Sequence, residues 1–136
     1  MNLDNIDLLC RDVDRMVDFY RDVVGLPLFL PYESGQGWAA FQAGAVTLYI
    51  FETGSAEAPH RRVHVAADDP PGLSAFGLAV ADLDAAVAAL DPKVTWAGEA
   101  RSWHHPSGIW YRFRAFYDPE GNVLSVTEPH KRPAGA

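Results

Sequence analysis

The side chains that could do chemistry in this chain are few and scattered. His104 and His105 are adjacent, and neighbouring side chains of an extended segment point apart, so this pair is weak evidence for a metal. His60 and His64 have an i, i+4 spacing, but their surroundings show no helical pattern that would bring them together. Asp7 stands in an apolar segment, where a carboxylate is costly unless it is paired or meets a polar or cationic ligand. Asp7 is therefore a candidate anchor for a ligand amine or hydroxyl.

Tryptophan is abundant for a chain of 136 residues, with four copies at Trp38, Trp96, Trp103 and Trp110. An indole face stacks on flat conjugated ligands and attracts cations, and each contact contributes roughly 0.5 to 2 kcal/mol. Packing in a core or a dimer interface suits any single one of them better. We nevertheless expect at least one of the four to contact a ligand.

Composition and charge narrow the class of protein. The length and the 49% hydrophobic content fit one globular domain, and the single Cys10 rules out an internal disulfide or a zinc ribbon. A formal charge of −7 opposes binding to nucleic acid or to an anionic membrane, whereas a cationic or neutral ligand is easier to accommodate. Neither a membrane-spanning run nor a signal-peptide pattern is visible, so we expect a cytoplasmic protein.

An internal repeat organises the chain. Asp12 is a natural N-cap for a stretch with apolar residues at i, i+3, i+4 and i+7, and Gly25 is a natural stop. Asp82 opens a second stretch with the same spacing, which ends at Asp91 and Pro92. The two caps are 70 residues apart, about half the chain. The sequence therefore predicts two copies of one unit, each with a single helix.

Strand-like segments surround both predicted helices. They are 6–10, 26–32, 38–43 and 45–51 in the first half, and 76–80, 93–99, 109–117 and 122–127 in the second. The Asp-Pro-Glu-Gly run at 118–121 predicts a hairpin turn. The order is βαβββ twice, which is an α+β fold. As one domain over 1–136, it comprises module one (about 1–52), a linker (about 53–72), module two (about 73–129) and a tail (130–136).

Several of these segments resemble the vicinal oxygen chelate superfamily, which includes glyoxalase I, extradiol dioxygenases, and the fosfomycin- and bleomycin-resistance proteins. The matching pieces are DVDRMVDFY at 12–20, VGL at 24–26, VADLD at 80–84 and FYDPEGNV at 116–123. The resemblance covers roughly residues 3–129. It implies that the eight strands of the two modules curve into an open cup with the helices packed outside.

Enzymes of this superfamily hold a divalent metal in the cup, with ligands from the first and the last strand of each module. The corresponding positions here are Asn5 and Ala75, and about Leu48 and Ser125. A Zn, Ni, Mn or Fe site needs three or four imidazole, carboxylate or thiolate donors, which these residues do not supply. We therefore predict a cup without a metal, and since no dinucleotide or phosphate loop is visible, without any other cofactor.

Strand alternation from Asn5 and Asp7 predicts a cup lining that is small and mostly apolar. Ala75 and Gly77 would either open a cavity there or let a neighbouring backbone approach closely. The loop 101–108 is expected at the rim, where it could touch a ligand. The alternative for Asp7 is an ion pair with Arg112 or Arg114. The predicted ligand-binding residues are Asn5, Asp7, Trp38, Leu48, Ile50, Ala75, Gly77, Trp103, His104, Trp110, Arg112 and Ser125.

The function predicted from this resemblance is a metal-free binding protein that sequesters an aromatic antibiotic or natural product, cationic or neutral, without changing it. The bleomycin-resistance proteins that it resembles are dimers, so we expect a homodimer. No catalytic residue is assigned in this interpretation. The alternative is a metal-independent lyase, isomerase or cyclase of the same superfamily, with Asp7 or a rim histidine as general base. A metal-dependent member with unusual ligands such as His104 is a third possibility.

Overall fold

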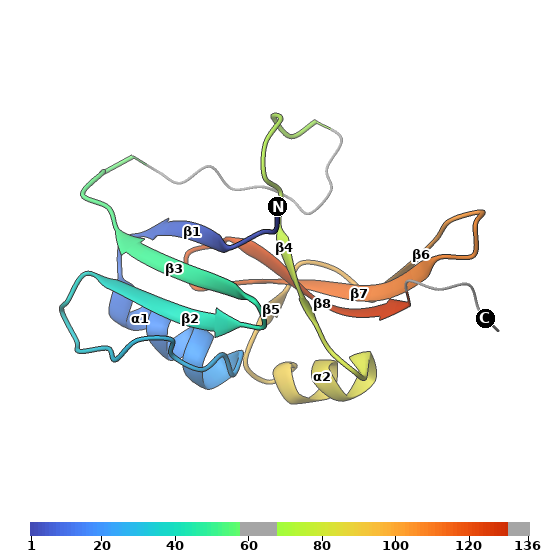
Figure 1. The fold of residues 1–136 in the computed structure, drawn as a ribbon, viewed down its shortest axis with the longest axis horizontal. Coiled ribbons are helices and arrows are strands. Elements are labelled where there is room, and N and C mark those ends of the chain that lie inside the picture. The colour runs from blue at the N-terminus through green and yellow to red at the C-terminus, as the bar shows by residue number, and fades with distance from the viewer. Residues whose placement is uncertain (58–67, 131–136) are drawn as a thin grey trace. The chain divides into compact units, whose positions relative to one another are not determined.

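The computed structural model describes residues 1–57 and 68–130. Contacts between Cα atoms divide the chain into two compact units, Met1–His60 and Arg61–Ala136, and each contains its own sheet (Figure 1). The described residues form eight strands and two short α-helices, which confirms the predicted α+β class. The His60 and His64 pair and residues 131–136 of the predicted tail lie outside the described residues.

The first unit is built on a three-stranded sheet. Strand β1 (Asn5–Cys10) runs parallel to β3 (Val46–Glu52), and β3 pairs with β2 (Trp38–Ala43) in the antiparallel sense. The order across the sheet is therefore β1-β3-β2. These three strands were predicted from the sequence to within two residues at each end.

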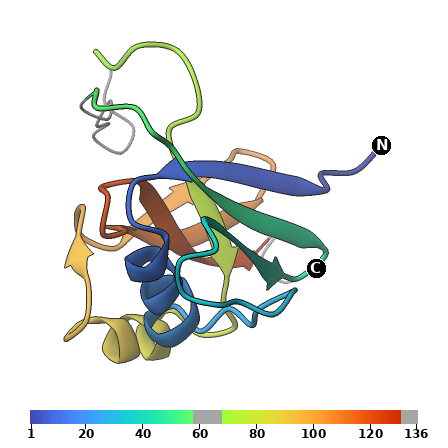
Figure 2. The same cartoon turned by 90° about the vertical axis from the view of Figure 1, so that its left-hand side faces the viewer.

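Helix α1 (Val13–Asp18) lies along one side of this sheet and continues into a π-helical segment, η1 (Phe19–Val23), as Figures 1 and 2 show for the whole helical stretch. The Asp12 carboxylate accepts a hydrogen bond of 3.0 Å from the backbone N–H of Arg15, which confirms the predicted N-cap. The Tyr20 ring packs on Phe41 of β2 at 5.9 Å between centroids. Gly25 follows with a φ of 86°, the left-handed conformation that suits the predicted stop.

The strand predicted at 26–32 does not form. Leu28 makes a single bridge with Phe41, and two further backbone hydrogen bonds of 2.8 Å tie the segment to β2, from Phe29 N–H to the Ala40 carbonyl and from Gln42 N–H to the Pro27 carbonyl. Pro27 and Pro31 have no N–H to donate, so a continuous ladder is impossible over these residues. The prediction of a strand at 26–32 was wrong because these two prolines interrupt its backbone hydrogen bonding.

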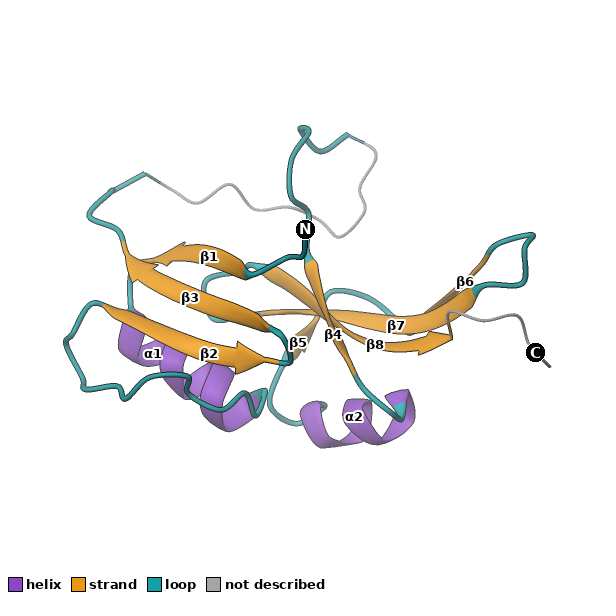
Figure 3. Cartoon of the chain, viewed as in Figure 1, coloured by secondary structure: helices purple, strands orange, loops and turns teal. Residues whose placement is uncertain are grey.

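The second unit contains five strands, shown in Figure 3. Their bounds are β4 (Phe76–Ala79), β5 (Thr95–Trp96), β6 (Arg101–His104), β7 (Trp110–Tyr117) and β8 (Val123–His130). The order is β4-β8-β7-β5, with β6 also paired to β7, and only β4 and β8 are parallel.

Two details of the second unit differ from the prediction. The strand expected at 93–99 shrinks to the two residues of β5, because Ala97 and Gly98 offer little side chain to pack on a sheet surface. The loop expected at 101–108 begins with strand β6, whose alternating side chains pair with those of β7.

Helix α2 (Leu83–Leu90) lies along one side of the second sheet (Figure 3). Asp82 caps it as predicted, since its carboxylate accepts a hydrogen bond of 3.1 Å from Ala85 N–H. The predicted turn between β7 and β8 is confirmed as well: the buried Asp118 accepts hydrogen bonds from the backbone N–H groups of Glu120 (2.9 Å) and Asn122 (3.0 Å). None of the described helices has the length and apolar character that a bilayer crossing requires.

Candidate ligand-binding site

An open groove of about 270 Å³ lies on the face of the second sheet that points away from α2. The register explains why its residues meet, because Gly77 of β4 pairs with Ser125 of β8 and Thr127 of β8 pairs with Phe113 of β7. Residues that pair across strands project to the same face. The groove is lined by Ala75, Phe76, Gly77, Tyr111, Phe113, Ser125 and Thr127.

The floor of the groove depends on the missing side chain of Gly77. A Cβ atom at this position would lie 3.1 Å from both the Ser125 Oγ and the Thr127 Oγ1, closer than nine in ten real Cβ contacts. These two hydroxyl oxygens are 3.2 Å apart and form a hydrogen bond with each other. The close approach that the sequence suggested at this glycine is therefore made by two hydroxyls, not by a backbone, and an open groove lies beside it.

One wall of the groove is aromatic. The Tyr111 and Phe113 rings are 5.6 Å apart between centroids, and Trp103 of β6 continues the row at 5.4 Å from Tyr111. Trp103 is 44% exposed, so much of its indole face is open to solvent. The structure thus extends the groove into an aromatic surface along the hairpin formed by β6 and β7.

Three of the predicted ligand-binding residues lie on the opposite face of the sheet, the one that α2 covers. Trp110 stacks between two imidazole rings there, with His104 at 5.7 Å and His130 at 3.8 Å between centroids. Arg112 lies on that face too, with its Nη2 atom 3.0 Å from Glu128 and 3.8 Å from Asp84 of α2. Trp110, Arg112 and His104 are therefore one residue of strand alternation away from the groove face, and their contact with a ligand stays a prediction.

The carboxylate of Glu128 organises the α2 side of the sheet. It accepts hydrogen bonds from Leu83 N–H at 2.8 Å and from Arg112 at 3.0 Å, and it lies 2.7 Å from His130 Nε2. The hydrogen bond from the Leu83 backbone, followed by those from His130 and Arg112, lowers the pKa of Glu128 to about 2. With a side chain that is only 14% exposed, Glu128 holds the helix to β8 and is not available to a ligand in the groove.

In the first unit, the predicted alternation of β3 relative to β1 is wrong by one residue. Asn5 and Asp7 lie on the open face of the first sheet, but their register partners are Thr47 and Tyr49. Leu48 and Ile50, which were expected to share that face, are buried on the opposite face with the residues that pack under α1. Both faces of β3 are apolar, so hydrophobic pattern alone does not reveal which face is open.

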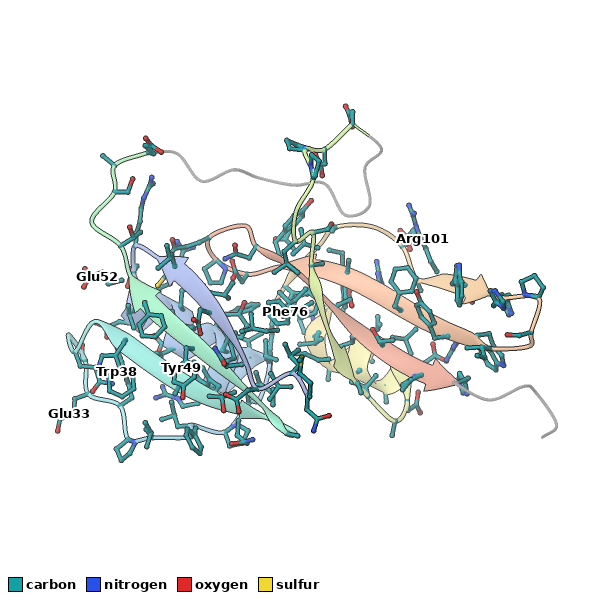
Figure 4. All side chains as sticks on the ribbon, turned by 45° about the horizontal axis from the view of Figure 1, so that its top comes forward. Glu33, Trp38, Tyr49, Glu52, Phe76 and Arg101 are labelled. Atoms are coloured by element: carbon teal, nitrogen blue, oxygen red, sulfur yellow. The ribbon has the colours of Figure 1, made fainter. Side chains whose placement is uncertain are left out.

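Asp7 is exposed and is not the carboxylate in an apolar lining that the sequence suggested. It lies on an exposed strand position and accepts a hydrogen bond of 2.8 Å from the Asn5 side chain, so its charge is not desolvated. The alternative ion pairs are also absent from the described residues, since Arg112 binds Glu128 and Arg114 lies 3.6 Å from Glu99. Of the predicted tryptophans, Trp38 opens β2 and pairs with Phe51 on the open face of the first sheet, near Tyr49 on the adjacent strand (Figure 4).

The donor set at the superfamily's metal positions does not fit a divalent cation. These positions hold Asn5 of β1, Ala75 just before β4 and Ser125 of β8, and in the first unit the open-face residues of β3 are Thr47 and Tyr49 in place of Leu48. Over residues 1–57 and 68–130, three or more His, Cys, Asp or Glu side chains nowhere gather as a metal site would require.

Ala75, Gly77 and Ser125 were predicted from the sequence and line the groove, and Trp103 adjoins it. Tyr111 and Phe113 were missed. The signal that could have found them was the alternation of β7, in which Arg112 faces α2 and Arg114 faces the loop after β5. Contact with a ligand stays a prediction for every one of these residues.

Solved structures share this fold over most of their length. A protein of unknown function from Agrobacterium tumefaciens str. C58 matches with a TM-score of 0.64 and 29% identity, over 94% of both chains. An integron cassette protein from V. cholerae gives a TM-score of 0.66 at 20% identity, over 94% of both chains. A glyoxalase/bleomycin resistance protein/dioxygenase from Alicyclobacillus acidocaldarius gives 0.67 at 15% identity, over 94% of this chain and 91% of that one.

Comparison with curated proteins yields no match. The family model of the Glyoxalase/Bleomycin resistance protein/Dioxygenase superfamily, in contrast, matches residues 2–126, which is most of the chain. This match agrees with the repeated capped helices, the order of the strands and the Asp118 turn described above. The chain therefore belongs to the glyoxalase/bleomycin resistance protein/dioxygenase superfamily.

Proposed function

We propose that this chain binds a flat aromatic small molecule in the groove of its second unit and releases it unchanged, as a sequestering protein of the bleomycin-resistance kind. The observation that carries the proposal is the groove itself, in which small residues and two hydroxyls meet an aromatic wall. Ligand sites in proteins commonly combine an apolar concave surface with a few convergent polar groups.

The shape and lining of the groove favour a planar ligand. Its volume of about 270 Å³ is near the lower end of the range of roughly 300 to 1,000 Å³ that ligand pockets occupy. Tyr111 and Phe113 offer ring faces and edges to a conjugated system, and Trp103 extends this surface outward. The seven lining residues are uncharged, so the cationic ligand that Asp7 suggested is no longer required.

Filling the groove tests the proposal. Ala75→Leu adds three carbon atoms at the groove, and Ala88→Leu adds the same three on an exposed position of α2 as a matched control. We expect Ala75→Leu to abolish the thermal shift and tryptophan quenching caused by anthraquinone and naphthalene probes, while Ala88→Leu leaves both unchanged. Bound probe should be recovered intact by mass spectrometry after denaturation. Equal binding by both variants would sink the proposal.

The enzyme alternative has less support in the described structure. The groove lining contains no imidazole or carboxylate, and His104 faces the opposite side of the sheet. Conversion of a bound probe to product would favour a metal-independent lyase, isomerase or cyclase. In that case Asp7→Asn would be a variant to examine, because it removes one of the predicted candidate bases. Asp7 is exposed, so the variant should still fold.

We also propose that the chain acts as a homodimer in the cytoplasm. Support for a dimer comes from the open face of the first sheet, where Leu9 is 67% exposed and Phe51 is 38% exposed. Sedimentation velocity should give twice the chain mass, and the double variant Leu9→Asp, Phe51→Asp should give the monomer. A single species of 14.9 kDa in the unmodified protein would contradict the proposal.

A further inference from the structure

Three arginines of the second sheet differ in how their charge is used. Arg112 lies 3.0 Å from Glu128, and Arg114 lies 3.6 Å from Glu99 while its guanidinium stacks on Trp96 at 4.2 Å from the ring centroid. Arg101 differs from both, because no ion pair or hydrogen bond joins its side chain to another residue in the described part of the chain. Among residues 1–57 and 68–130, nothing therefore pairs with the Arg101 charge.

The position of Arg101 places this charge beside the groove. Arg101 pairs with Phe113 across β6 and β7, so both side chains project to the open face of the sheet. Phe113 lines the groove and also lines a small adjoining hollow of about 20 Å³, whose other wall includes Arg101. Phe113 is thus the shared wall between the aromatic groove and the cation. Figure 4 shows the Arg101 side chain extending away from the ribbon at the start of β6.

We propose that the groove selects aromatic anions, and specifically planar aromatic carboxylates. The ring system lies against Phe113 and Tyr111, and the carboxylate pairs with the Arg101 guanidinium, whose fork of N–H donors matches a carboxylate in two parallel hydrogen bonds. This inference rests on the proposed function, since it assigns the chemistry of the ligand that the groove would hold.

The two hydroxyls on the floor add a second polar contact. Each hydroxyl has one donor and two acceptor positions, so the bond between Ser125 Oγ and Thr127 Oγ1 leaves both oxygens able to bond a ligand. A ring hydroxyl or carbonyl group on the buried end of the ligand suits this pair. The ligand then has a polar group at one end, an aromatic body, and an anionic group at the exposed end.

The other charges near the site do not cancel this preference. Glu99 also lines the small hollow, but it is 92% exposed and already pairs with Arg114. The net charge of −7 acts over distances that salt screens, because the Debye length is about 8 Å at physiological ionic strength. A cation bound on the aromatic wall would gain from the ring faces but would be repelled by Arg101.

Three probes of one shape separate the contribution of charge from that of the ring: 2-naphthoate, 2-naphthamide and 2-naphthylmethylammonium. Their affinities would be measured by calorimetry at low salt for the unmodified protein, Arg101→Gln, Arg101→Lys and Lys93→Gln. Lys93→Gln is the matched control, because it removes the same charge from an exposed position just after α2. Thermal melts of each variant check that the fold is retained.

We expect naphthoate to bind about three- to fivefold more tightly than naphthamide, the range of an exposed ion pair, and the ammonium probe to bind most weakly. Arg101→Gln should remove the preference without weakening naphthamide, Arg101→Lys should keep part of it, and Lys93→Gln should keep all of it. Equal affinity for the three probes, or equal losses in Arg101→Gln and Lys93→Gln, would overturn the inference while leaving the groove's function intact. Failure of all three probes to bind would overturn the proposed function together with the inference.

Discussion

The carboxylate of Glu128 accepts a hydrogen bond of 2.8 Å from the backbone N–H of Leu83, so strand β8 supplies a cap to the first residue of helix α2. The anion lies at the helix N-terminus, where the unpaired N–H groups favour negative charge. This one contact joins two elements that are 45 residues apart in the sequence.

Replacing this carboxylate should weaken the second unit. Glu128→Gln keeps the size of the side chain but removes the charge that Leu83, Arg112 and His130 share, so we expect its melting temperature to fall by several degrees. Glu33→Gln removes one exposed negative charge and should leave the melting temperature unchanged. Calorimetric melts at pH 7 compare the two, and equal melting temperatures would contradict the role of Glu128.

The same carboxylate predicts how stability depends on pH. The pKa of Glu128 is about 2 in the folded protein and 4.5 in the reference state, so its contribution is fully present above pH 4.5 and is lost as the pH falls toward 2. The free energy of unfolding should therefore differ between the unmodified protein and Glu128→Gln by a constant amount above about pH 5. Urea titrations at several pH values should show this difference shrinking below pH 4.5.

Tyr32, in the loop after η1, predicts a second dependence of stability on pH, in the alkaline range. Burial and a hydrogen bond donated to Asp14 raise the pKa of Tyr32 to about 12, so the stability that this phenol contributes is present below pH 10 and lost as the pH rises toward 12. Asp14→Asn removes the charged acceptor and should bring the pKa of Tyr32 down toward 10. Absorbance of tyrosinate at alkaline pH measures the change, with Asp4→Asn as an exposed acidic control outside helix α1.

Both helix caps and the hairpin turn could be predicted from the sequence because each depends on residues close together in the chain, and the repeat followed from the matching patterns after the two caps. Asp12 and Asp82 need only the N–H groups three residues further on, and Asp118 needs only its own turn. The open faces of the sheets could not all be predicted in this way. The choice between Leu48 and Tyr49 depends on which face α1 covers, and both are apolar residues that suit burial.

The same distinction between local pattern and distant contacts decides which residues of the candidate site could be predicted. Ala75, Gly77 and Ser125 followed from alternation in strands whose other face is plainly apolar, at Leu78 and Leu124. In β7, aromatic residues and arginines alternate, and Arg112 was predicted to contact the ligand. Arg112 instead finds its partners in Glu128 and Asp84, which are distant in sequence and could not be assigned to it from the chain alone.

Arg114 provides a test of packing on that same face. Its guanidinium stacks on Trp96 at 4.2 Å and donates a hydrogen bond of 2.9 Å to the Gly98 carbonyl. Arg114→Lys loses the planar stack and the fixed donor geometry, so we expect a loss of about 1 to 2 kcal/mol in the free energy of unfolding. Urea unfolding followed by tryptophan emission measures it. Arg15→Lys, at an exposed position of α1, should cost nothing measurable.

The floor of the groove can be tested by a double-mutant cycle. Gly77→Ala places a Cβ 3.1 Å from the Ser125 and Thr127 hydroxyls, so we expect a cost of about 1 kcal/mol and weaker binding of aromatic probes. Ser125→Ala in the same chain should relieve part of this loss of stability. The double variant should then lose less stability than the sum of the two single losses. Gly98→Ala is the matched control, because a Cβ there meets nothing within 4 Å. Full additivity of the two substitutions would contradict the crowding at Gly77.

The seven residues that line the groove all belong to one of the two repeated units. After a gene segment duplicates, two equivalent halves can diverge at different rates if only one of them carries recognition. In our proposal, selection for a new ligand acts on a few positions of β4, β7 and β8, and the first half has to keep only its own packing and the proposed dimer contact at Leu9 and Phe51. New specificities could then evolve by a handful of substitutions while the shared scaffold stays intact.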